Sequence, residues 1–421
     1  MADLLRLVTA GSVDGGKSTM IGRLLFDSKH IFDDQLAAIE AASIRRSRGH
    51  LDLSLLTDGL RAEREQGITI DVAYRYFSTP NRKFVIADTP GHVQYTRNMV
   101  TGASTAALCV LVVDIVKGLV EQTRRHATLA SLLGVRTLVV AVNKMDVVDF
   151  GEEAFAKLRA EFERFCAPLD FREIAFIPMS ALRGDNVVHA SDAMPWYDGL
   201  PLLAHLETVD VAAVDSLPHL RLPVQLVLRD GQRHPARVYA GRLLAGTVGV
   251  GDEVLVLPAQ VRTRIESVTS SGAPVDRAGA PASVAVAIAD DIDVSRGFML
   301  VDADHPPAIV REFSAIVCWM SDRPMQPDTT YAIKHTTSWG KAIVRSIDFR
   351  YDVKDLGHPE QADMLVSNDI GRIRLVSTTP LFADPYAANR STGSFILVDE
   401  LTMNTVAAGM IVDDNDADRR P

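Results

Sequence analysis

Apolar strands alternate with helical patterns in the first half of the chain. Nearly continuous apolar runs occur at residues 4–10, 83–87, 108–113, 137–142 and 174–179. Between these runs, residues 121–133 and 152–166 carry apolar side chains at helical spacing. Parallel strands that are covered on both faces read as continuous apolar runs. The pattern therefore predicts an α/β domain with a mostly parallel sheet and helices on both of its faces.

Beyond Pro218 the pattern changes to short runs of Val, Ile and Leu that are separated by Gly, Pro and Asp. This spacing is typical of antiparallel strands in small barrels. A Pro-Pro pair at 306–307 indicates a second boundary. The predicted organisation is an α/β domain at 1–215, a β-barrel domain at 216–307, a second β-barrel domain at 308–412 and a disordered polar tail at 413–421.

The composition is that of an ordinary globular protein, with 47% hydrophobic and 23% charged residues among 421. A formal net charge of −10 argues against a nucleic-acid or anionic-membrane surface, so neither kind of partner is expected. Three cysteines lie far apart without zinc-ligand spacing or a disulfide framework, which favours a reducing compartment. Because the N-terminus has no secretory pattern and no apolar run could span a bilayer, a cytoplasmic location is expected.

A glycine-rich stretch follows the first apolar run and precedes a helical pattern. It consists of Gly11, Ser12, Val13, Asp14, Gly15, Gly16, Lys17, Ser18 and Thr19. The spacing of its glycines, lysine and serine matches a phosphate-binding loop, whose backbone N–H groups converge on an anion at a helix N-terminus. Lys17 can then reach the β- and γ-phosphates, and the Ser18 hydroxyl can ligate Mg²⁺. The alternative is a glycine turn that happens to precede Lys-Ser.

A second motif, Asp88, Thr89, Pro90 and Gly91, stands at the end of the run at 83–87. A carboxylate at this place can hold Mg²⁺ through a water molecule, while the N–H of Gly91 can sense the γ-phosphate. Thr69 precedes an alternating strand pattern and is the expected Mg²⁺ ligand of a segment that a bound nucleoside triphosphate orders. We therefore expect Ser18, Thr69 and Asp88 to be the metal ligands.

His92, directly after Gly91, is the candidate catalytic residue. A histidine beside a γ-phosphate sensor can orient or polarise the attacking water. The alternative is a surface histidine next to a turn. The other histidines show no triad or metal-ligand spacing, and those in helical patterns, such as His126, are expected to pack or face solvent.

Two further motifs point to guanine. Asn143, Lys144 and Asp146 follow the run at 137–142, and Ser180, Ala181 and Leu182 follow the next run. A carboxylate at Asp146 can accept hydrogen bonds from N1–H and the 2-amino group of guanine, a pair of donors that adenine lacks. The Lys144 stem can lie along the base, and the backbone of the second motif can read guanine O6. Each motif alone has a bland explanation as a turn or a cap, but their order on a parallel-sheet pattern predicts a domain that binds GTP and Mg²⁺.

With these motifs assembled, the chain resembles the translation-factor GTPases of the elongation factor Tu type, which have a GTPase domain followed by two β-barrels. Residues 62–77 and 94–104 look more specifically like the GTPase subunit of bacterial sulfate adenylyltransferase, the CysN type. Stretches at 317–320, 334–337 and 391–397 extend that likeness to the last domain. The chain departs from its relatives at Gly15, where Asp or His is usual, and at Gln66 and Val93.

The resemblance implies a GTPase that pairs with a smaller catalytic subunit, which binds ATP and sulfate. That partner would transfer AMP from ATP to sulfate, giving adenosine 5′-phosphosulfate and pyrophosphate, and GTP hydrolysis would drive the step. Some members carry a C-terminal adenylylsulfate kinase, an activity not expected here because no second phosphate-loop pattern follows. The alternatives are a translation factor that delivers RNA to the ribosome and a switch whose output is binding alone.

Overall fold

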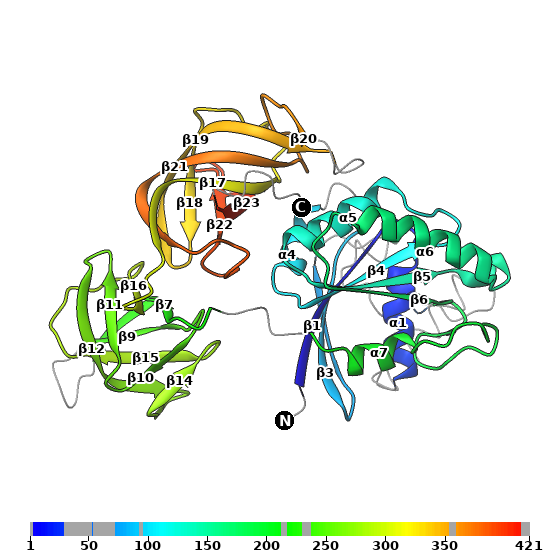
Figure 1. Cartoon of the computed structure of the whole chain (residues 1–421), viewed down its shortest axis with the longest axis horizontal. Coiled ribbons are helices and arrows are strands. Elements are labelled where there is room, and N and C mark those ends of the chain that lie inside the picture. The colour runs from blue at the N-terminus through cyan, green and yellow to red at the C-terminus, as the bar shows by residue number, and fades with distance from the viewer. Residues whose placement is uncertain are drawn as a thin grey trace. The chain divides into compact units, whose positions relative to one another are not determined.

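The computed structural model describes residues 3–28, 53, 72–91, 96–211, 217–229, 237–352 and 359–413. The chain divides into two compact units, an α/β unit up to residue 212 and a β-rich unit, both drawn in Figure 1. The predicted domain limit at 215 and the tail residues 414–421 lie outside the described residues.

A six-stranded sheet forms the centre of the first unit, in the order β2-β3-β1-β4-β5-β6. Its strands are β1 (Asp3–Gly11), β2 (Ala73–Ser78), β3 (Arg82–Asp88), β4 (Leu108–Asp114), β5 (Thr137–Asn143) and β6 (Glu173–Pro178). All neighbours are parallel except β2 and β3. Every residue of β4 and β5 is buried, as the continuous apolar runs predict.

Helices cover both faces of this sheet, which confirms the predicted α/β architecture (Figure 1). They are α1 (Lys17–Asp27), α4 (Thr96–Ala103), α5 (Glu121–Leu132), α6 (Glu152–Cys166) and α7 (Leu202–Thr208), with a 3₁₀ helix η3 (Met145–Val148). Met20, Ile21 and Leu24 of α1 share a core with Leu202 and Leu206 of α7. Helices α1 and α7 therefore lie on one face, and α5 and α6 lie on the opposite face (Figure 1).

The second unit begins with an antiparallel sheet of eight strands, in the order β7-β16-β11-β12-β15-β9-β8 with β13 beside β12. These are β7 (Arg221–Pro223), β8 (Leu226–Arg229), β9 (Arg237–Arg242), β11 (Glu253–Leu257), β12 (Val261–Ser270), β13 (Ala273–Pro274), β15 (Ser283–Ile288) and β16 (Met299–Asp302). A separate pair is formed by β10 (Thr247–Gly249) and β14 (Arg277–Gly279). Inward-facing valines and leucines, among them Leu222, Val254 and Val286, make its core.

The remaining strands of the second unit close into a six-stranded barrel. The order runs β18-β22-β23-β17-β21-β19, and β19 pairs back with β18. The strands are β17 (Ala308–Trp319), β18 (Thr330–His335), β19 (Ser338–Tyr351), β21 (Ile370–Ala383), β22 (Ser394–Val398) and β23 (Thr405–Val412), with β20 (Pro359–Glu360) added to β19. Trp319 lies in the barrel core and is 1% exposed. The closed barrel confirms the β-barrel predicted for this part of the chain.

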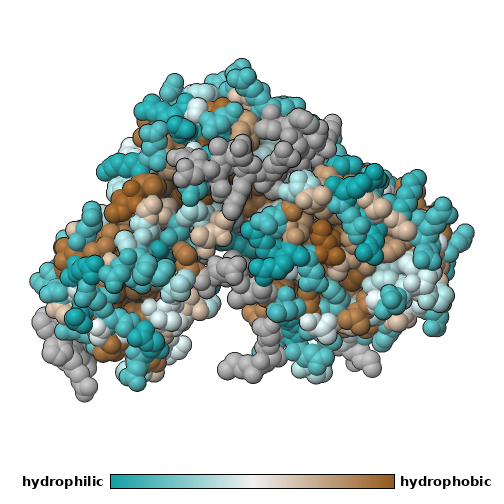
Figure 2. Space-filling model, viewed as in Figure 1, coloured by the Kyte–Doolittle hydropathy of each residue, from teal (hydrophilic) through white to brown (hydrophobic). Residues whose placement is uncertain are grey.

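Hydrophilic side chains cover most of the visible face in Figure 2, and apolar side chains appear there in scattered groups. No helix within the described ranges combines the length and the apolar character that crossing a membrane requires.

Candidate functional site

The sequence motifs of the first unit meet at one edge of its sheet. Parallel pairing sets Thr9 of β1 beside Asp88 of β3, and Asp114 of β4 beside Asn143 of β5. Because parallel strands share the edge at which they end, the loops that follow them lie together. The structure thus gathers residues 11–19, 88–91, 143–146 and 180–182 in one place, while Thr69 and His92 lie outside the described residues.

The glycine-rich loop turns from β1 directly into α1. The N–H of Gly15 donates to the carbonyl of Ser12 at 3.2 Å, and Asp14 and Gly16 have φ angles of 60° and 87°. A Cβ at Gly16 would lie only 2.2 Å from Nδ2 of Asn143, so this position requires glycine. The loop ends at the N-terminus of α1, where backbone N–H groups and the helix dipole favour an anion.

Lys17 and Asp88 form a buried ion pair beneath this loop. Lys17 Nζ lies 2.8 Å from Asp88 Oδ1, and the two residues are 7% and 1% exposed. The hydroxyl of Thr9 donates to the same carboxylate oxygen at 3.2 Å. Hydrogen bonds of this kind hold the carboxylate where the sequence placed a metal-binding group. A phosphate bound in the loop would compete with Asp88 for Lys17.

The segment after β3 packs tightly against the loop. The Thr89 hydroxyl donates to the carbonyl of Thr9 at 2.7 Å, and Pro90 is buried. A Cβ at Gly91 would lie 2.8 Å from the carbonyl oxygen of Gly11. The backbone of Gly91 therefore approaches the glycine-rich loop more closely than a residue with a side chain would allow.

Asn143 joins the glycine-rich loop to the loop after β6. Its Nδ2 donates to the carbonyl of Gly15 at 2.9 Å, and its Oδ1 accepts from the N–H of Ala181 at 2.9 Å. The side chain is 3% exposed, so both bonds are shielded from water. One residue thereby sets the spacing between the glycine-rich loop and the loop after β6.

Lys144 is held by a carboxylate that the sequence motifs did not include. Its Nζ donates to Asp114 Oδ2 at 2.8 Å, while Asp114 Oδ1 accepts from the N–H of Val116 at 2.9 Å. Burial would raise the pKa of Asp114, but these hydrogen bonds and the charge of Lys144 hold that pKa below its usual value. Asp114 therefore stays ionised and orients Lys144, whose φ of 67° turns the chain into η3.

Asp146 and the loop after β6 form the other end of the site. The Ser180 hydroxyl donates to Asp146 Oδ1 at 2.6 Å, and Asp146 is half-buried. Arg23 of α1 donates to the carbonyl of Leu182 at 2.7 Å, which ties this loop to the helix that begins at the phosphate loop. Leu182 itself is 56% exposed. The Asp146 carboxylate, in the segment after β5, is therefore held in place by Ser180 of the loop after β6.

Four supporting residues were missed by the motif analysis. They are Thr9, Arg23, Asp114 and Lys117, the last of which donates from Nζ to the carbonyl of Val13 at 3.1 Å. Asp114 follows an apolar run in the same way as Asp88 and Asn143 do, so its position at a strand end was the available signal. Arg23 offered no signal because its partner lies 159 residues away.

The fold and the site define a GTP-binding domain of the elongation factor Tu class. Residues 2–217 match the family model described as the elongation factor Tu GTP binding domain, and residues 312–412 match the model described as GTP-eEF1A C-terminal domain-like.

Similar curated proteins extend the match over nearly the whole chain. The bifunctional enzyme CysN/CysC of Mycobacterium tuberculosis is 53% identical over 419 residues, which cover 98% of this chain and 68% of that protein. Sulfate adenylyltransferase subunit 1 of Bacteroides fragilis is 50% identical, with coverage of 98% and 86%, and that of Alteromonas mediterranea is 47% identical, with coverage of 98% and 87%. The chain belongs to the sulfate adenylyltransferase subunit 1 family, which confirms the resemblance drawn from the motifs.

Proposed function

We propose that this chain is the GTP-hydrolysing subunit of a sulfate adenylyltransferase. A smaller catalytic partner transfers AMP from ATP to sulfate, yielding adenosine 5′-phosphosulfate and pyrophosphate, and GTP hydrolysis in this chain drives that step. The observation that carries the proposal is the Asn143 bridge between the loops for phosphate and base, in a chain of this family. The translation-factor alternative is disfavoured because relatives that match 98% of this chain at 47–53% identity are named CysN/CysC or sulfate adenylyltransferase subunit 1.

The phosphate end of the site offers a donor set that suits a nucleotide and Mg²⁺. Loop N–H groups and Lys17 bind the phosphates, and the hydroxyl of Ser18 with the carboxylate of Asp88 supplies the hard oxygen donors that Mg²⁺ prefers. When bound, Mg²⁺ would neutralise charge on the β- and γ-phosphates. Thr69 completes the proposed metal ligands, and His92 is proposed to orient the attacking water.

The base end favours guanine over adenine. Asp146 accepts from Ser180, and its carboxylate has further acceptor capacity for N1–H and the 2-amino group of guanine. Adenine has no such pair of donors and would leave that carboxylate unpaired. Lys144, held by Asp114, lies along the base plane in this proposal.

The family and the cysteines support a partner subunit and a compartment for this chain. Relatives named subunit 1 imply a second subunit, which we take to be the smaller one that binds ATP and sulfate. Cys109, Cys166 and Cys318 are buried and form no disulfide, which supports a reducing compartment, the cytoplasm.

A coupled hydrolysis assay tests this function. GTP turnover by the purified chain is measured alone, with the smaller subunit, and with that subunit plus ATP and sulfate. We expect turnover to rise only in the last mixture, together with adenosine 5′-phosphosulfate. GTP turnover that is indifferent to the subunit, ATP and sulfate would refute the coupling.

Two variants test the proposed roles of single site residues. Asp146→Asn exchanges a pair of acceptors for one acceptor and one donor, so it should weaken GTP binding and improve binding of xanthosine triphosphate. His92→Ala should leave GTP affinity unchanged and lower hydrolysis by ~10²-fold or more. If Asp146→Asn binds both nucleotides as the parent chain does, the assignment of the base site is wrong.

A further inference from the structure

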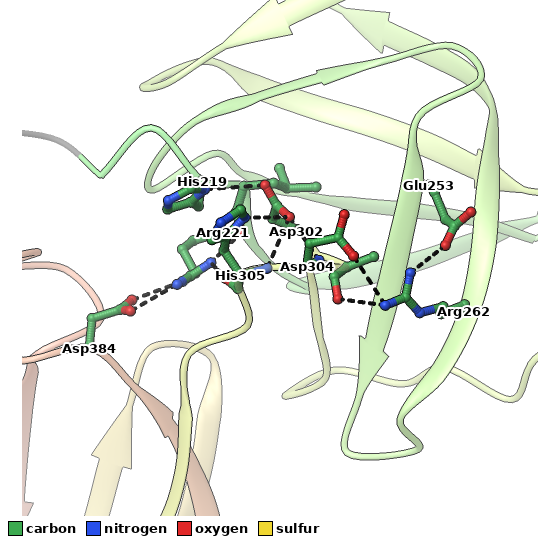
Figure 3. Close-up of polar contacts among 10 residues, drawn as sticks. His219, Arg221, Glu253, Arg262, Asp302, Asp304, His305 and Asp384 are labelled. Atoms are coloured by element: carbon green, nitrogen blue, oxygen red, sulfur yellow. Dashed lines mark hydrogen bonds and ion pairs between the residues drawn. The ribbon is translucent and has the colours of Figure 1, made fainter.

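Two histidines and an aspartate far apart in the sequence converge in the β-rich unit. Strand β7 pairs antiparallel with β16, and the N–H of Asp302 donates to the carbonyl of Leu220 at 3.2 Å. This register places Asp302 next to His219, the residue before Leu220. The chain then turns back, because Asp302 Oδ1 accepts from the N–H groups of Asp304 and His305 at 3.0 and 3.1 Å. Figure 3 shows the resulting cluster.

The cluster brings three candidate ligand side chains together, and rotation of the stacked imidazole rings would let both Nδ1 atoms face one ion. Nδ1 of His219 lies 3.3 Å from Asp302 Oδ2, and Nδ1 of His305 lies 3.4 Å from Asp302 Oδ1. The imidazole rings are stacked with their centroids 3.9 Å apart, and one ligand atom from each residue falls within 4.8 Å of the others. N–H···O hydrogen bonds are usually shorter, at about 2.9–3.0 Å. Ligands at about 2.0–2.1 Å from a tetrahedral ion lie about 3.3–3.4 Å apart, which is the distance from each histidine Nδ1 to its own oxygen of Asp302.

The donor types and their exposure also suit an ion. Imidazole nitrogen with one carboxylate oxygen is a donor set that favours Zn²⁺ and its neighbours among the transition metals over Mg²⁺ or Ca²⁺. The side chains of His219, Asp302 and His305 are 29%, 33% and 59% exposed, so an ion and a water molecule can reach them. Asp304 points away from the cluster, and its Oδ1 lies 3.2 Å from a guanidinium nitrogen of Arg262 (Figure 3).

We propose that His219, Asp302 and His305 bind one divalent transition-metal ion of the zinc class. The ion takes a lone pair from Nδ1 of each neutral histidine and from the carboxylate, and each imidazole keeps its one ring proton on Nε2. This site is separate from the GTPase function and from its Mg²⁺. Neither its spacing in the sequence nor any motif indicated it, since the ligands come from the two ends of one domain.

The ion would cross-link the segment before β7 to the end of β16. Arg221 strengthens the same corner, because its Nη1 donates to the carbonyl of His305 at 2.9 Å. The other nitrogens of Arg221 make two 2.9 Å bonds to Asp384, at the end of β21 (Figure 3). An ion that holds His219 and His305 in place would therefore also hold the segment between β16 of the eight-stranded sheet and β17 of the barrel.

Zinc titration of the full chain tests the proposal. After chelator treatment and dialysis, Zn²⁺ binding is measured by calorimetry in excess Mg²⁺, which occupies hard oxygen sites. Variants His219→Ala and His305→Ala remove one ligand each and leave the backbone bonds to Asp302 in place. His189→Ala removes an exposed histidine of the other unit as the matched control.

We expect one Zn²⁺ per chain, a rise in the thermal midpoint on adding Zn²⁺, and visible absorption of a tetrahedral site when Co²⁺ replaces Zn²⁺. Each ligand variant should lower the affinity at least ~10-fold and abolish the rise, whereas His189→Ala should do neither. The proposal is overturned if the parent chain binds no Zn²⁺, or if both ligand variants bind it as tightly as the parent.

Discussion

Asn143 offers the sharpest test of the candidate site, because one buried side chain connects two of its loops. Asn143→Ala removes the hydrogen bonds to the Gly15 carbonyl and from the Ala181 N–H, both 2.9 Å long. Asn143→Asp keeps the shape and the acceptor but sets a carboxylate oxygen against the Gly15 carbonyl. Both variants should separate the phosphate loop from the base loop.

The size of the effect follows from the burial of the two backbone groups. Gly15 and Ala181 are buried, and a buried polar group left without a partner costs about 1–3 kcal/mol. Two such groups, partly met by water that enters the cavity, should cost about 2–4 kcal/mol in total. Without nucleotide the two loops can relax, so the cost falls mainly on the free energy of nucleotide binding. GDP and GTP should then bind about 30-fold to 1,000-fold more weakly.

Equilibrium binding of a fluorescent GDP analogue and urea unfolding measure the two parts of this cost. Asn186→Ala is a matched control, because Asn186 is also buried and makes two 2.9 Å bonds, to the Pro178 carbonyl and from the Ser191 N–H. It should lose stability and keep its affinity. Unchanged affinity in Asn143→Ala, or an equal loss in both variants, would refute the reasoning.

Three other predictions concern single residues. Gly16→Ala should abolish GTP binding, because φ at this position is 87° and the added Cβ would clash with Asn143. Gly15→Ala, whose Cβ would come no closer than 3.1 Å to another atom, should retain GTP binding in the same assay. His126 is fully buried, and burial, with the charges of Lys17 and Arg125, lowers its pKa to about 3 from 6.5, so the unfolded state binds the proton first. Urea unfolding should show stability falling by about 1.6 kcal/mol from pH 6.5 to 5, and His126→Gln should flatten that slope. Arg221→Ala leaves the buried Asp384 without its ion-pair partner, with only the Thr392 hydroxyl still donating to it, and should cost about 3–5 kcal/mol by urea unfolding. A cost no larger than that of a surface arginine variant such as Arg159→Ala would contradict it.

Much of the first unit could be predicted because its chemistry stands at strand ends. The apolar runs before Asp88 and Asn143 are buried parallel strands, and such strands bring their last residues to one edge whatever the loops between them do. The helix at 152–166 was predicted to the residue, since its apolar spacing is regular.

The rest depends on pairing that local patterns do not contain. His219 and Asp302 meet only because β7 pairs with β16, more than 70 residues later in the chain, in one particular register. The short helix α7 escaped prediction because seven residues carry too little periodicity, and β23 because Ala and Gly interrupt its apolar run. Arg23 and Asp114 act through partners that are set by the tertiary fold.

The six-stranded barrel has a further consequence for how this protein meets other molecules. With each of its six strands hydrogen-bonded to two neighbours, the barrel offers little main chain for an incoming strand to extend. A partner that binds the barrel therefore contacts mainly its side chains. A substitution on the outer surface can change partner binding without breaking the hydrogen bonds between the strands.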